Sequence, residues 1–233
     1  MKLHTVAMIP ARGGSKRIPK KNIIDFNGEP MICRTIRAAQ NSNIFDDIIV
    51  NTDDDEIAEI SKINGISIPF KRRSCEDDYS NISDVTIDFI EQYELEKKKI
   101  IDEVIVLLPN CPIRDENDII EAYNFFNQNN KPIQISAVKF GWMNPWWAHT
   151  INQNNVAKNI FNVGQKRSQD LDELYFPTGA IWIANAKTLV HRKSFYNGEF
   201  TFFPMDWKKG IDIDTYEDLE LAKLIDIKDE CES

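Results

Sequence analysis

The sequence predicts an α/β fold with a mainly parallel sheet and helices on both of its faces. Two observations lead to this prediction. Short apolar runs rich in β-branched residues, typical of buried strands, recur along the chain, and segments with helical spacing lie between them. This order favours parallel pairing, because a connection between parallel strands has to cross a face of the sheet. The length of 233 residues fits a single domain over residues 1–233.

The individual elements follow from the same patterns. The expected strands are, in chain order, Thr5 to Ile9, Ile48 to Asn51, Ile66 to Phe70, Val104 to Leu108, Ile133 to Val138 and Ala180 to Ala184. The expected helices are Pro30 to Asn41, Asp54 to Asn64, Ser83 to Lys98, Glu116 to Asn129 and, near the end, about Tyr216 to Leu224. In such a sheet ligands bind beyond the carboxyl ends of the strands, so we expect the chemistry in the loops after Ile9, Phe70 and Leu108.

Two segments break the regular pattern. Between about 141 and 173 the apolar spacing dissolves among tryptophan and asparagine residues, which predicts an excursion from the sheet that serves as a lid or a dimerisation arm. Residues from about 226 to 233 are polar and terminal, which predicts a frayed tail.

The chain is acidic overall, with 37 Asp and Glu against 28 Lys and Arg residues, a net charge of -9 and a pI near 4.9. This balance argues against nucleic acid and anionic membranes as partners. No apolar run approaches the roughly 20 residues that span a bilayer. The four cysteines form no CxxC pair, no secretory leader precedes them and the three histidines are scattered. We therefore expect a soluble, cytoplasmic protein without a zinc site.

A glycine-rich basic loop directly follows the first expected strand. Five basic residues and no acidic one lie between Arg12 and Lys21, while the rest of the chain carries 23 basic against 37 acidic residues. The glycines can expose backbone N–H groups to an anion, and Arg12, Lys16 and Lys21 can neutralise a polyphosphate of charge about -4. Neither the Walker nor the dinucleotide-binding glycine spacing is present. The alternative is a solvated basic turn.

Asp212 and Asp214 lie on one face of an extended segment, because side chains alternate at period 2. Two adjacent carboxylates repel each other unless a cation bridges them, and a pair of them suits Mg²⁺ together with substrate phosphates. The alternative is that Asp214 or Thr215 caps the helix that follows.

Several motifs together resemble one enzyme family. The run PARGGSKRIPKKNI from Pro10 is similar to the N-terminal signature of the cytidylyltransferases that activate nonulosonic acids, the nine-carbon sugar acids of the sialic type. Further similar motifs are NTDD at 51–54, PIR at 112–114, RSQDL at 167–171, GA at 179–180, DIDT at 212–215 and ED at 217–218. The RSQDL motif most resembles the pseudaminic acid enzymes. The resemblance implies a Rossmann-like fold of the nucleotide-diphospho-sugar transferase type and a homodimer in which the excursion reaches the neighbouring subunit.

The resemblance also implies CTP as a substrate, Mg²⁺ (with Mn²⁺ as the alternative) as the cofactor, and roles for particular residues. Those assigned to the nucleotide are Ala11, Arg12, Gly13, Gly14, Ser15, Lys16, Lys21, Asn22, Arg72 and Ser80. Arg72, with Arg73 close behind, would contact cytosine, and Asn22 and Ser80 the ribose, although Asn22 could equally be a turn or cap residue. Asp212 and Asp214 would bind the metal. The expected catalytic residues are Arg12, Lys16, Lys21 and Asp214.

Arg167 and Gln169 are the best candidates for the sugar acid, because a guanidinium beside an amide suits a carboxylate and its neighbouring hydroxyls, and Trp147 is a further candidate. A surface ion pair is the alternative for Arg167. Two departures from the sialic acid pattern, Leu108 in place of a glutamine and Trp147 in place of a lysine, favour a deoxygenated or N-acylated sugar. The surrounding tryptophans are also typical of an interface anchor.

These assignments predict transfer of CMP from CTP to the anomeric hydroxyl of a nonulosonic acid, with pseudaminic acid favoured, and release of pyrophosphate. The same reaction on sialic, legionaminic or an eight-carbon ulosonic acid is the first alternative. A nucleotide-binding protein without turnover is the second. The proton acceptor is either a metal-bound water or a carboxylate such as Asp214.

Overall fold

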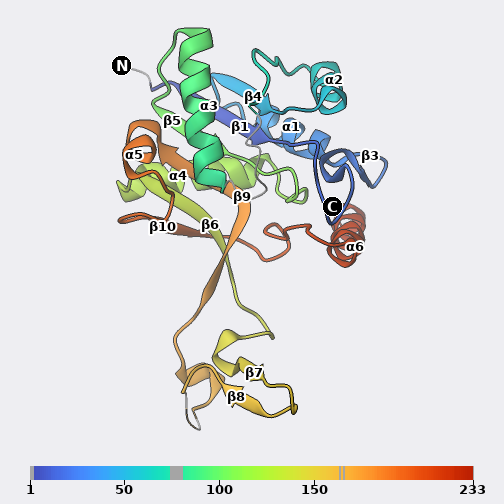
Figure 1. Ribbon diagram of the computed structural model, residues 1–233, viewed down its shortest axis with the longest axis vertical. Coiled ribbons are helices and arrows are strands. Elements are labelled where there is room, and N and C mark those ends of the chain that lie inside the picture. Colours follow the sequence, from blue (N-terminus) through green and yellow to red (C-terminus); the bar gives the residue numbers. More distant parts are fainter. Residues whose placement is uncertain (1–2, 74–80, 163, 165, 233) are drawn as a thin grey trace.

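The computed structural model describes residues 3–73, 81–162, 164 and 166–232, and a six-stranded sheet forms its centre (Figure 1). The strands are β1 (Thr5–Pro10), β4 (Asp47–Asn51), β5 (Glu103–Val106), β6 (Ile133–Lys139), β9 (Tyr175–Asn185) and β10 (Thr201–Pro204). Their order across the sheet is β10-β6-β9-β5-β1-β4. All neighbours pair in parallel except at β9, which runs antiparallel to both β5 and β6. The prediction of a mainly parallel sheet is confirmed.

Helices cover both faces of this sheet. They are α1 (Met31–Ser42), α2 (Asp55–Ile63), α3 (Ile82–Lys97), α4 (Glu116–Asn129), α5 (Ala186–Arg192) and α6 (Tyr216–Glu232). Ala7 and Ile9 of β1 point into a core that includes α1, α2 and α4. Val6 and Met8 point to the other side, into a core that includes α3 and α5. Among the described residues, no helix is long and apolar enough to cross a membrane.

A third, smaller core joins segments that are distant in the sequence. Ile18 comes from the glycine-rich loop, Phe26 from the hairpin of β2 (Asp25–Phe26) and β3 (Glu29–Pro30), and Leu219 and Ala222 from α6. Its buried members all lie outside the six-stranded sheet. The C-terminal helix is therefore attached to the region of the glycine-rich loop.

The prediction of a strand from Ile66 to Phe70 is wrong. The segment has no strand pairing, and Pro69 lacks the N–H group that a ladder needs. Ile66 is buried in the core with α1 and α2, whereas Phe70 lies against Phe89 of α3, with ring centroids 5.8 Å apart. The apolar alternation reflects a loop that packs on both cores.

The sequence patterns also missed α5 and the edge strand β10.

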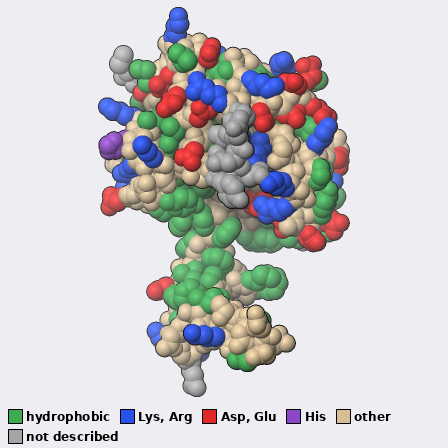
Figure 2. Space-filling model, viewed as in Figure 1, with side chains coloured by type: hydrophobic (Ala, Val, Ile, Leu, Met, Phe, Trp, Pro, Cys, Tyr) green, Lys and Arg blue, Asp and Glu red, His purple; other side chains and the backbone are tan. Residues whose placement is uncertain are grey.

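Residues 140–174 form an arm that stands away from the body and is carried by the ends of β6 and β9 (Figure 1). The arm holds the two-stranded sheet of β7 (His149–Ile151) and β8 (Ala157–Asn159) and the short 3-10 helices η2 (Pro145–Trp147) and η3 (Ser168–Asp170). Hydrophobic side chains gather along it and where it joins the body (Figure 2). Trp142 is 89% exposed and Trp147 is 43% exposed. A large apolar surface of this kind is typical of an interface.

The expectation of a frayed tail from residue 226 is wrong, because residues 226–232 continue α6. Asp226 is buried and accepts hydrogen bonds from Arg34 and Asn27. The charged sequence of this helix reflects its mostly exposed surface.

Candidate active site

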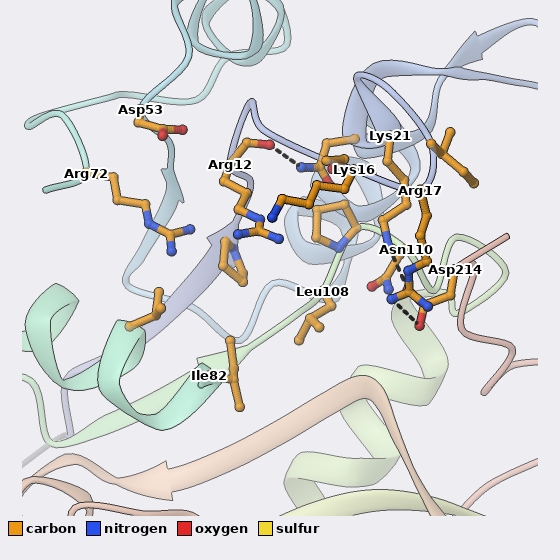
Figure 3. Close-up of a pocket in the computed structure, with 16 residues that line it drawn as sticks. Arg12, Lys16, Arg17, Lys21, Asp53, Arg72, Ile82, Leu108, Asn110 and Asp214 are labelled. Atoms are coloured by element: carbon orange, nitrogen blue, oxygen red, sulfur yellow. Dashed lines mark hydrogen bonds and ion pairs between the residues drawn. The ribbon is translucent and has the colours of Figure 1, made fainter. Parts of the chain in front are cut away.

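A pocket of about 520 Å³ opens at the carboxyl ends of β1, β4 and β5 (Figure 3). Its walls come from the loops after these three strands, the start of α3 and the loop before α6. The lining residues are Pro10, Arg12, Ser15, Lys16, Arg17, Ile18, Lys21, Asn22, Asp53, Arg72, Ile82, Val85, Leu108, Pro109, Asn110 and Asp214. The pocket thus lies at the edge of the sheet where α/β folds bind ligands.

The turn after β4 supports the glycine-rich loop. Gly13 donates its N–H to Asp53 Oδ1 at 3.0 Å. A Cβ atom at Gly13 would lie 2.4 Å from Asp54 Oδ2, so a larger residue here would force Asp54 or the loop to move. The Ser15 N–H donates to the Gly13 carbonyl at 3.1 Å. The Gly13 N–H group, which was expected to face an anion, is therefore bonded within the protein, and so is the N–H group of Ser15, whereas Gly14 has open space around it.

Four of the five basic side chains of the loop line the pocket, at Arg12, Lys16, Arg17 and Lys21. Arg12 and Lys16 direct their charged ends into it (Figure 3). Lys20 instead forms an ion pair with Glu56 of α2, outside the pocket. The convergence of four cations on one cavity favours an anion-binding site over a solvated basic turn.

Two predicted nucleotide contacts serve as braces of this loop. The Ala11 residue is fully buried, and its N–H donates to the Asn51 carbonyl of β4 at 3.0 Å. Asn22 lies in the short helix η1 (Lys21–Ile23) and is 7% exposed. Its Nδ2 donates to the Arg12 carbonyl at 2.9 Å. Asn22 therefore holds the loop, as the turn alternative predicted, while also lining the pocket.

The second predicted acidic residue, Asp214, faces the cations across the pocket. Its Oδ1 accepts from Lys21 Nζ at 2.9 Å, and its Oδ2 pairs with Arg17 Nη2 at 2.9 Å. The helix cap that was the alternative role is made by its neighbours. Thr215 Oγ1 accepts the Asp218 N–H at 3.2 Å, and Asp218 Oδ2 accepts the N–H groups of Asp214 and Thr215. The Asp214 carboxylate remains directed toward the pocket.

Asp212 lies deeper, behind the pocket wall. It accepts a hydrogen bond from Asn110 Nδ2, and the Ile213 N–H donates to the Asn110 carbonyl at 2.8 Å. Burial raises the pKa of Asp212 to about 6, and the charge of Asp214 raises it as well. Lys21 and the Asn110 amide oppose this increase. Asn110 thus joins the loop after β5 to the acidic loop.

This pair of carboxylates fits a hard divalent cation. Both donors are oxygens, and a bound cation would relieve their mutual repulsion, which adds to the effect of burial in raising the pKa of Asp212. Within the described residues no group of three or more His, Cys, Asp or Glu side chains could hold a metal. Asp212 and Asp214 would therefore hold Mg²⁺ together with water and substrate oxygens, as is usual for this ion.

Arg72 lines the other end of the pocket, and its backbone N–H donates to the Thr52 carbonyl at 2.8 Å. Arg73 does not line the pocket, because its guanidinium pairs with Asp88 of α3 at 3.3 Å. The geometry thus favours Arg72 over Arg73 as a base contact. Ser80 lies outside the described residues. Ile82, Val85 and Leu108 supply apolar wall between the two ends.

The predicted sugar contacts are not brought to this pocket within one chain. Trp147, Arg167 and Gln169 all lie on the arm and do not line the pocket. Arg167 forms the surface ion pair that was its alternative, with Nε 2.9 Å from Asp170 Oδ2. The arm stands away from the body, so its residues lie apart from the site of the same copy (Figure 1).

Three functional candidates were not predicted from the sequence, and one of them is Arg17, which lines the pocket and pairs with Asp214. Asp53 and Asn110 line the pocket and hold the glycine-rich loop and Asp212, respectively. Asp53 belongs to the NTDD motif, and Asn110 follows a predicted strand. Their place in loops at strand ends was the available signal, but the partners that they hold are distant in sequence.

Comparisons with known proteins agree with this geometry. The protein family described as cytidylyltransferase matches residues 6–228. The chain belongs to this family. Cytidylyltransferases are nucleotidyltransferase enzymes, so the family resemblance and the enzyme class predicted from the sequence are confirmed.

Individual relatives are similar along nearly the whole chain. Pseudaminic acid cytidylyltransferase from Campylobacter jejuni is 35% identical over 225 residues, 96% of each chain. CMP-N,N'-diacetyllegionaminic acid synthase from Legionella pneumophila is 31% identical over 233 residues, which cover 98% of this chain and 99% of that one. The structure of CMP:2-keto-3-deoxy-manno-octonic acid synthetase complexed with CTP matches with a TM-score of 0.71 over 97% and 99% of the two chains, at 18% identity. The last likeness shows a shared fold.

Proposed function

We propose that this cytidylyltransferase transfers CMP from CTP to the anomeric hydroxyl of pseudaminic acid and releases pyrophosphate. The observation that carries the proposal is the 35% identity, over 96% of both chains, to a pseudaminic acid cytidylyltransferase. The pocket supports it, because four cations and a carboxylate meet at the carboxyl ends of the central strands. Residues 1–233 form one catalytic domain in this proposal.

In the reaction the anomeric oxygen passes its proton to a base, either a carboxylate such as Asp214 or a water molecule, and bonds to the α-phosphorus of CTP, while the bond from that phosphorus to the β-phosphate oxygen breaks. Negative charge therefore increases on the departing pyrophosphate. Arg12, Lys16 and Lys21 neutralise it, the arginine as a planar fork and the lysines as point charges. Fixed cations of this kind lower the barrier because they need no rearrangement when the charge develops.

Asp212 and Asp214 hold Mg²⁺ in this proposal, with Mn²⁺ as the alternative, and the ion supplies additional positive charge to the phosphates. Asn110 holds the Asp212 carboxylate from the side of β5, whereas Lys21 holds that of Asp214 from the side of the glycine-rich loop. The two carboxylates are thus fixed from opposite walls before any ligand binds.

The nucleoside lies at the other end of the pocket. Arg72 donates to the cytosine ring. Ser80 and the side-chain oxygen Oδ1 of Asn22 contact the ribose. Asn22 is assigned through its oxygen, because its Nδ2 already holds the Arg12 carbonyl. The Gly14 backbone and the Ser15 hydroxyl contact the phosphates, whereas Ala11 and Gly13 contribute by shaping the loop.

Leu108 makes the wall toward the sugar apolar. It lines the pocket, and Gly179 packs so closely that a Cβ there would lie 3.0 Å from Leu108 Cδ2. An apolar group at this position favours a sugar that carries a methyl or an N-acyl group where sialic acid carries a hydroxyl.

We also propose a homodimer in which the arm of one copy reaches the pocket of the other. Trp147, Arg167 and Gln169 would then complete the sugar site in trans, and the exposed Trp142 would be covered. Trp142→Ser should convert the dimer to a monomer in light scattering. Ile63→Ser, at a side chain 76% exposed on the body, should leave the dimer intact. A monomeric native protein would contradict the arrangement.

The function is tested with a panel of sugar acids. The protein is incubated with CTP, Mg²⁺ and pseudaminic, legionaminic, sialic or an eight-carbon ulosonic acid, and pyrophosphate release is measured. Pseudaminic acid should give the largest kcat/KM. A preference for another acid overturns the substrate, and CTP binding without pyrophosphate release from any acid identifies a non-catalytic nucleotide-binding protein.

CTP as a substrate and the free thiols of Cys33 and Cys111 favour a cytoplasmic location.

A further inference from the structure

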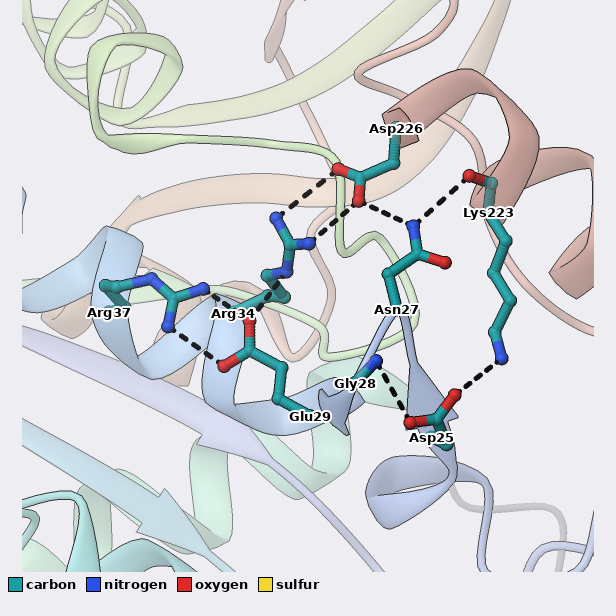
Figure 4. A network of polar contacts seen from close by, with 8 residues as sticks. All are labelled: Asp25, Asn27, Gly28, Glu29, Arg34, Arg37, Lys223 and Asp226. Carbon is teal, nitrogen blue, oxygen red and sulfur yellow. Dashed lines mark hydrogen bonds and ion pairs between the residues drawn. The ribbon is translucent and has the colours of Figure 1, made fainter. Parts of the chain in front are cut away.

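A buried polar cluster joins α6 to the β2–β3 hairpin, outside the pocket (Figure 4). The carboxylate of Asp226 accepts from Arg34 Nη2 and from Asn27 Nδ2, both at 2.8 Å. The Asn27 amide also donates to the Lys223 carbonyl at 3.2 Å. Arg34 is held in turn by Glu29, with Nε 2.7 Å from Oε1. The side chain of Asp226 is 8% exposed, so this ion pair is shielded from solvent.

Asp226 occupies the buried stripe of α6. Leu219 and Ala222 precede it at helical spacing on the same face and belong to the third core. An apolar side chain at position 226 could pack there without the cost of desolvating a carboxylate. The charge instead fixes the register of α6, because one rotation and one axial position of the helix place the Asp226 carboxylate within hydrogen-bond distance of both Arg34 and Asn27.

The register of α6 determines where Asp214 lies, because this residue immediately precedes the first turn. Asp218 Oδ2 accepts the N–H groups of Asp214 at 3.0 Å and of Thr215 at 2.8 Å, so the acidic loop moves with the helix. Asp226 holds the same helix about 12 Å further along its axis than Asp218. A slip by one residue would shift the loop by about 1.5 Å and turn it by about 100°.

The hairpin, in turn, is continuous with the cationic loop. Lys21 lies in η1, which directly precedes β2, and Ile18 of the loop packs in the same core as Phe26 of the hairpin. Lys21 is therefore attached to the hairpin and Asp214 to α6. The two residues meet in the pocket, where Lys21 Nζ lies 2.9 Å from Asp214 Oδ1.

We propose that Asp226, Arg34 and Asn27 form a clamp that sets the position of the acidic loop relative to the cationic loop. They are positioning residues, since none of them lines the pocket. The effect of the clamp on turnover rests on the proposed function, whereas its effect on the acidic loop is a property of the free protein.

Two variants remove the clamp with little other change. Asn27→Gly keeps the turn, because Asn27 has a φ of 50° that glycine adopts readily, but loses both hydrogen bonds to α6. Asp226→Asn keeps the shape and loses the charge. Lys223→Ala is the matched control, because it removes a more exposed ion pair, 2.8 Å to Asp25, between the same helix and the same hairpin.

The first measurement is hydrogen exchange of the protein without metal or substrate. In both clamp variants the backbone amides of residues 213–219 should exchange about tenfold faster than in the native protein and in Lys223→Ala, while those of β5 stay unchanged. Native exchange rates at 213–219 in both clamp variants would overturn the clamp, whether or not the protein proves to be an enzyme.

The second measurement is the Mg²⁺ concentration at half-maximal rate with CTP and pseudaminic acid. It should rise about fivefold in the clamp variants, with the KM for CTP within about twofold of the native value, because the acidic loop is displaced while the base site is not. Residues that only stabilised the fold would lower Tm and leave this Mg²⁺ dependence native, which would overturn the positioning role. A native protein without turnover would overturn the proposed function, and the exchange rates would still decide on the clamp.

Discussion

Gly13→Ala tests how the glycine-rich loop is held. The added Cβ would lie 2.4 Å from Asp54 Oδ2 and 3.0 Å from Asp54 Cβ. Asp54 cannot turn away without a loss, because its Oδ1 accepts the N–H groups of Glu56 at 2.9 Å and Ile57 at 3.0 Å and thereby caps α2. If the loop moves instead, the bond of 3.0 Å from the Gly13 N–H to Asp53 breaks.

The expected cost follows from these two interactions. Loss of a helix N-cap costs about 1 kcal/mol, and loss of a hydrogen bond to a charged acceptor costs about 1.5 to 3 kcal/mol. Because one or the other is lost, Gly13→Ala should lower the free energy of unfolding by about 1 to 3 kcal/mol, which corresponds to a Tm lower by roughly 2 to 12 °C for a chain of this size. CTP affinity should fall about tenfold, because Arg12 and Lys16 flank the displaced residue.

Thermal unfolding followed by circular dichroism and calorimetric titration with CTP measure both effects. Gly14→Ala is the matched control for stability, because a Cβ there meets nothing within 4 Å, and its Tm should be native. In an Asp54→Ser background, where the shorter side chain still caps α2, Gly13→Ala should lower the free energy of unfolding about half as much. Equal Tm in Gly13→Ala and Gly14→Ala would refute the proposed support of the loop.

Three further predictions concern the ends of the pocket. Asp214→Ala should lower turnover roughly 100-fold or more with an unchanged circular dichroism spectrum; near-native turnover at saturating Mg²⁺ would place the metal elsewhere. Arg72→Ala should weaken CTP binding about tenfold in calorimetry while Arg73→Ala leaves it native, and the reverse result would exchange their roles. Burial raises the pKa of Asp212 from 3.8 to about 6, so its neutral form stabilises the metal-free fold below about pH 4, and this contribution is lost as the pH rises through 6. Urea unfolding in EDTA at pH 4 and 7 should therefore show a smaller difference for Asp212→Asn than for the native protein; an equal difference would contradict the raised pKa.

The central strands and helices were predictable because their patterns are local. Buried parallel strands appear as apolar runs, and α1 to α4 show helical spacing between them. The direction of β9 was not predictable, because an apolar run has the same pattern in either direction. The run from Ile66 to Phe70 misled for a similar reason, since packing against two cores produces the same alternation as a strand. The predicted end of α6 came too early because, over residues 216–227, where burial is described, only the narrow stripe of Leu219, Ala222 and Asp226 is buried.

At the site, the cationic loop and the acidic pair were visible because each is continuous in the sequence. Their meeting, through Lys21 and Asp214, and the support from Asp53 and Asn110 depend on tertiary contacts between separate loops. The expected exposure of the Gly13 N–H group was wrong, because the nearby Asp53 accepts it. The expectation that the arm reaches a neighbouring subunit came from the family resemblance, because no local pattern in the sequence indicates it.

The central claim is tested most directly by identifying the product formed from CTP and pseudaminic acid in the presence of Mg²⁺. Mass spectrometry should detect CMP-pseudaminic acid, and enzymatic assay should find one pyrophosphate per molecule of it. The Asp214→Ala protein should form both at roughly one hundredth of the native rate or less. Native protein that binds CTP but forms neither a CMP-sugar nor pyrophosphate would contradict the account.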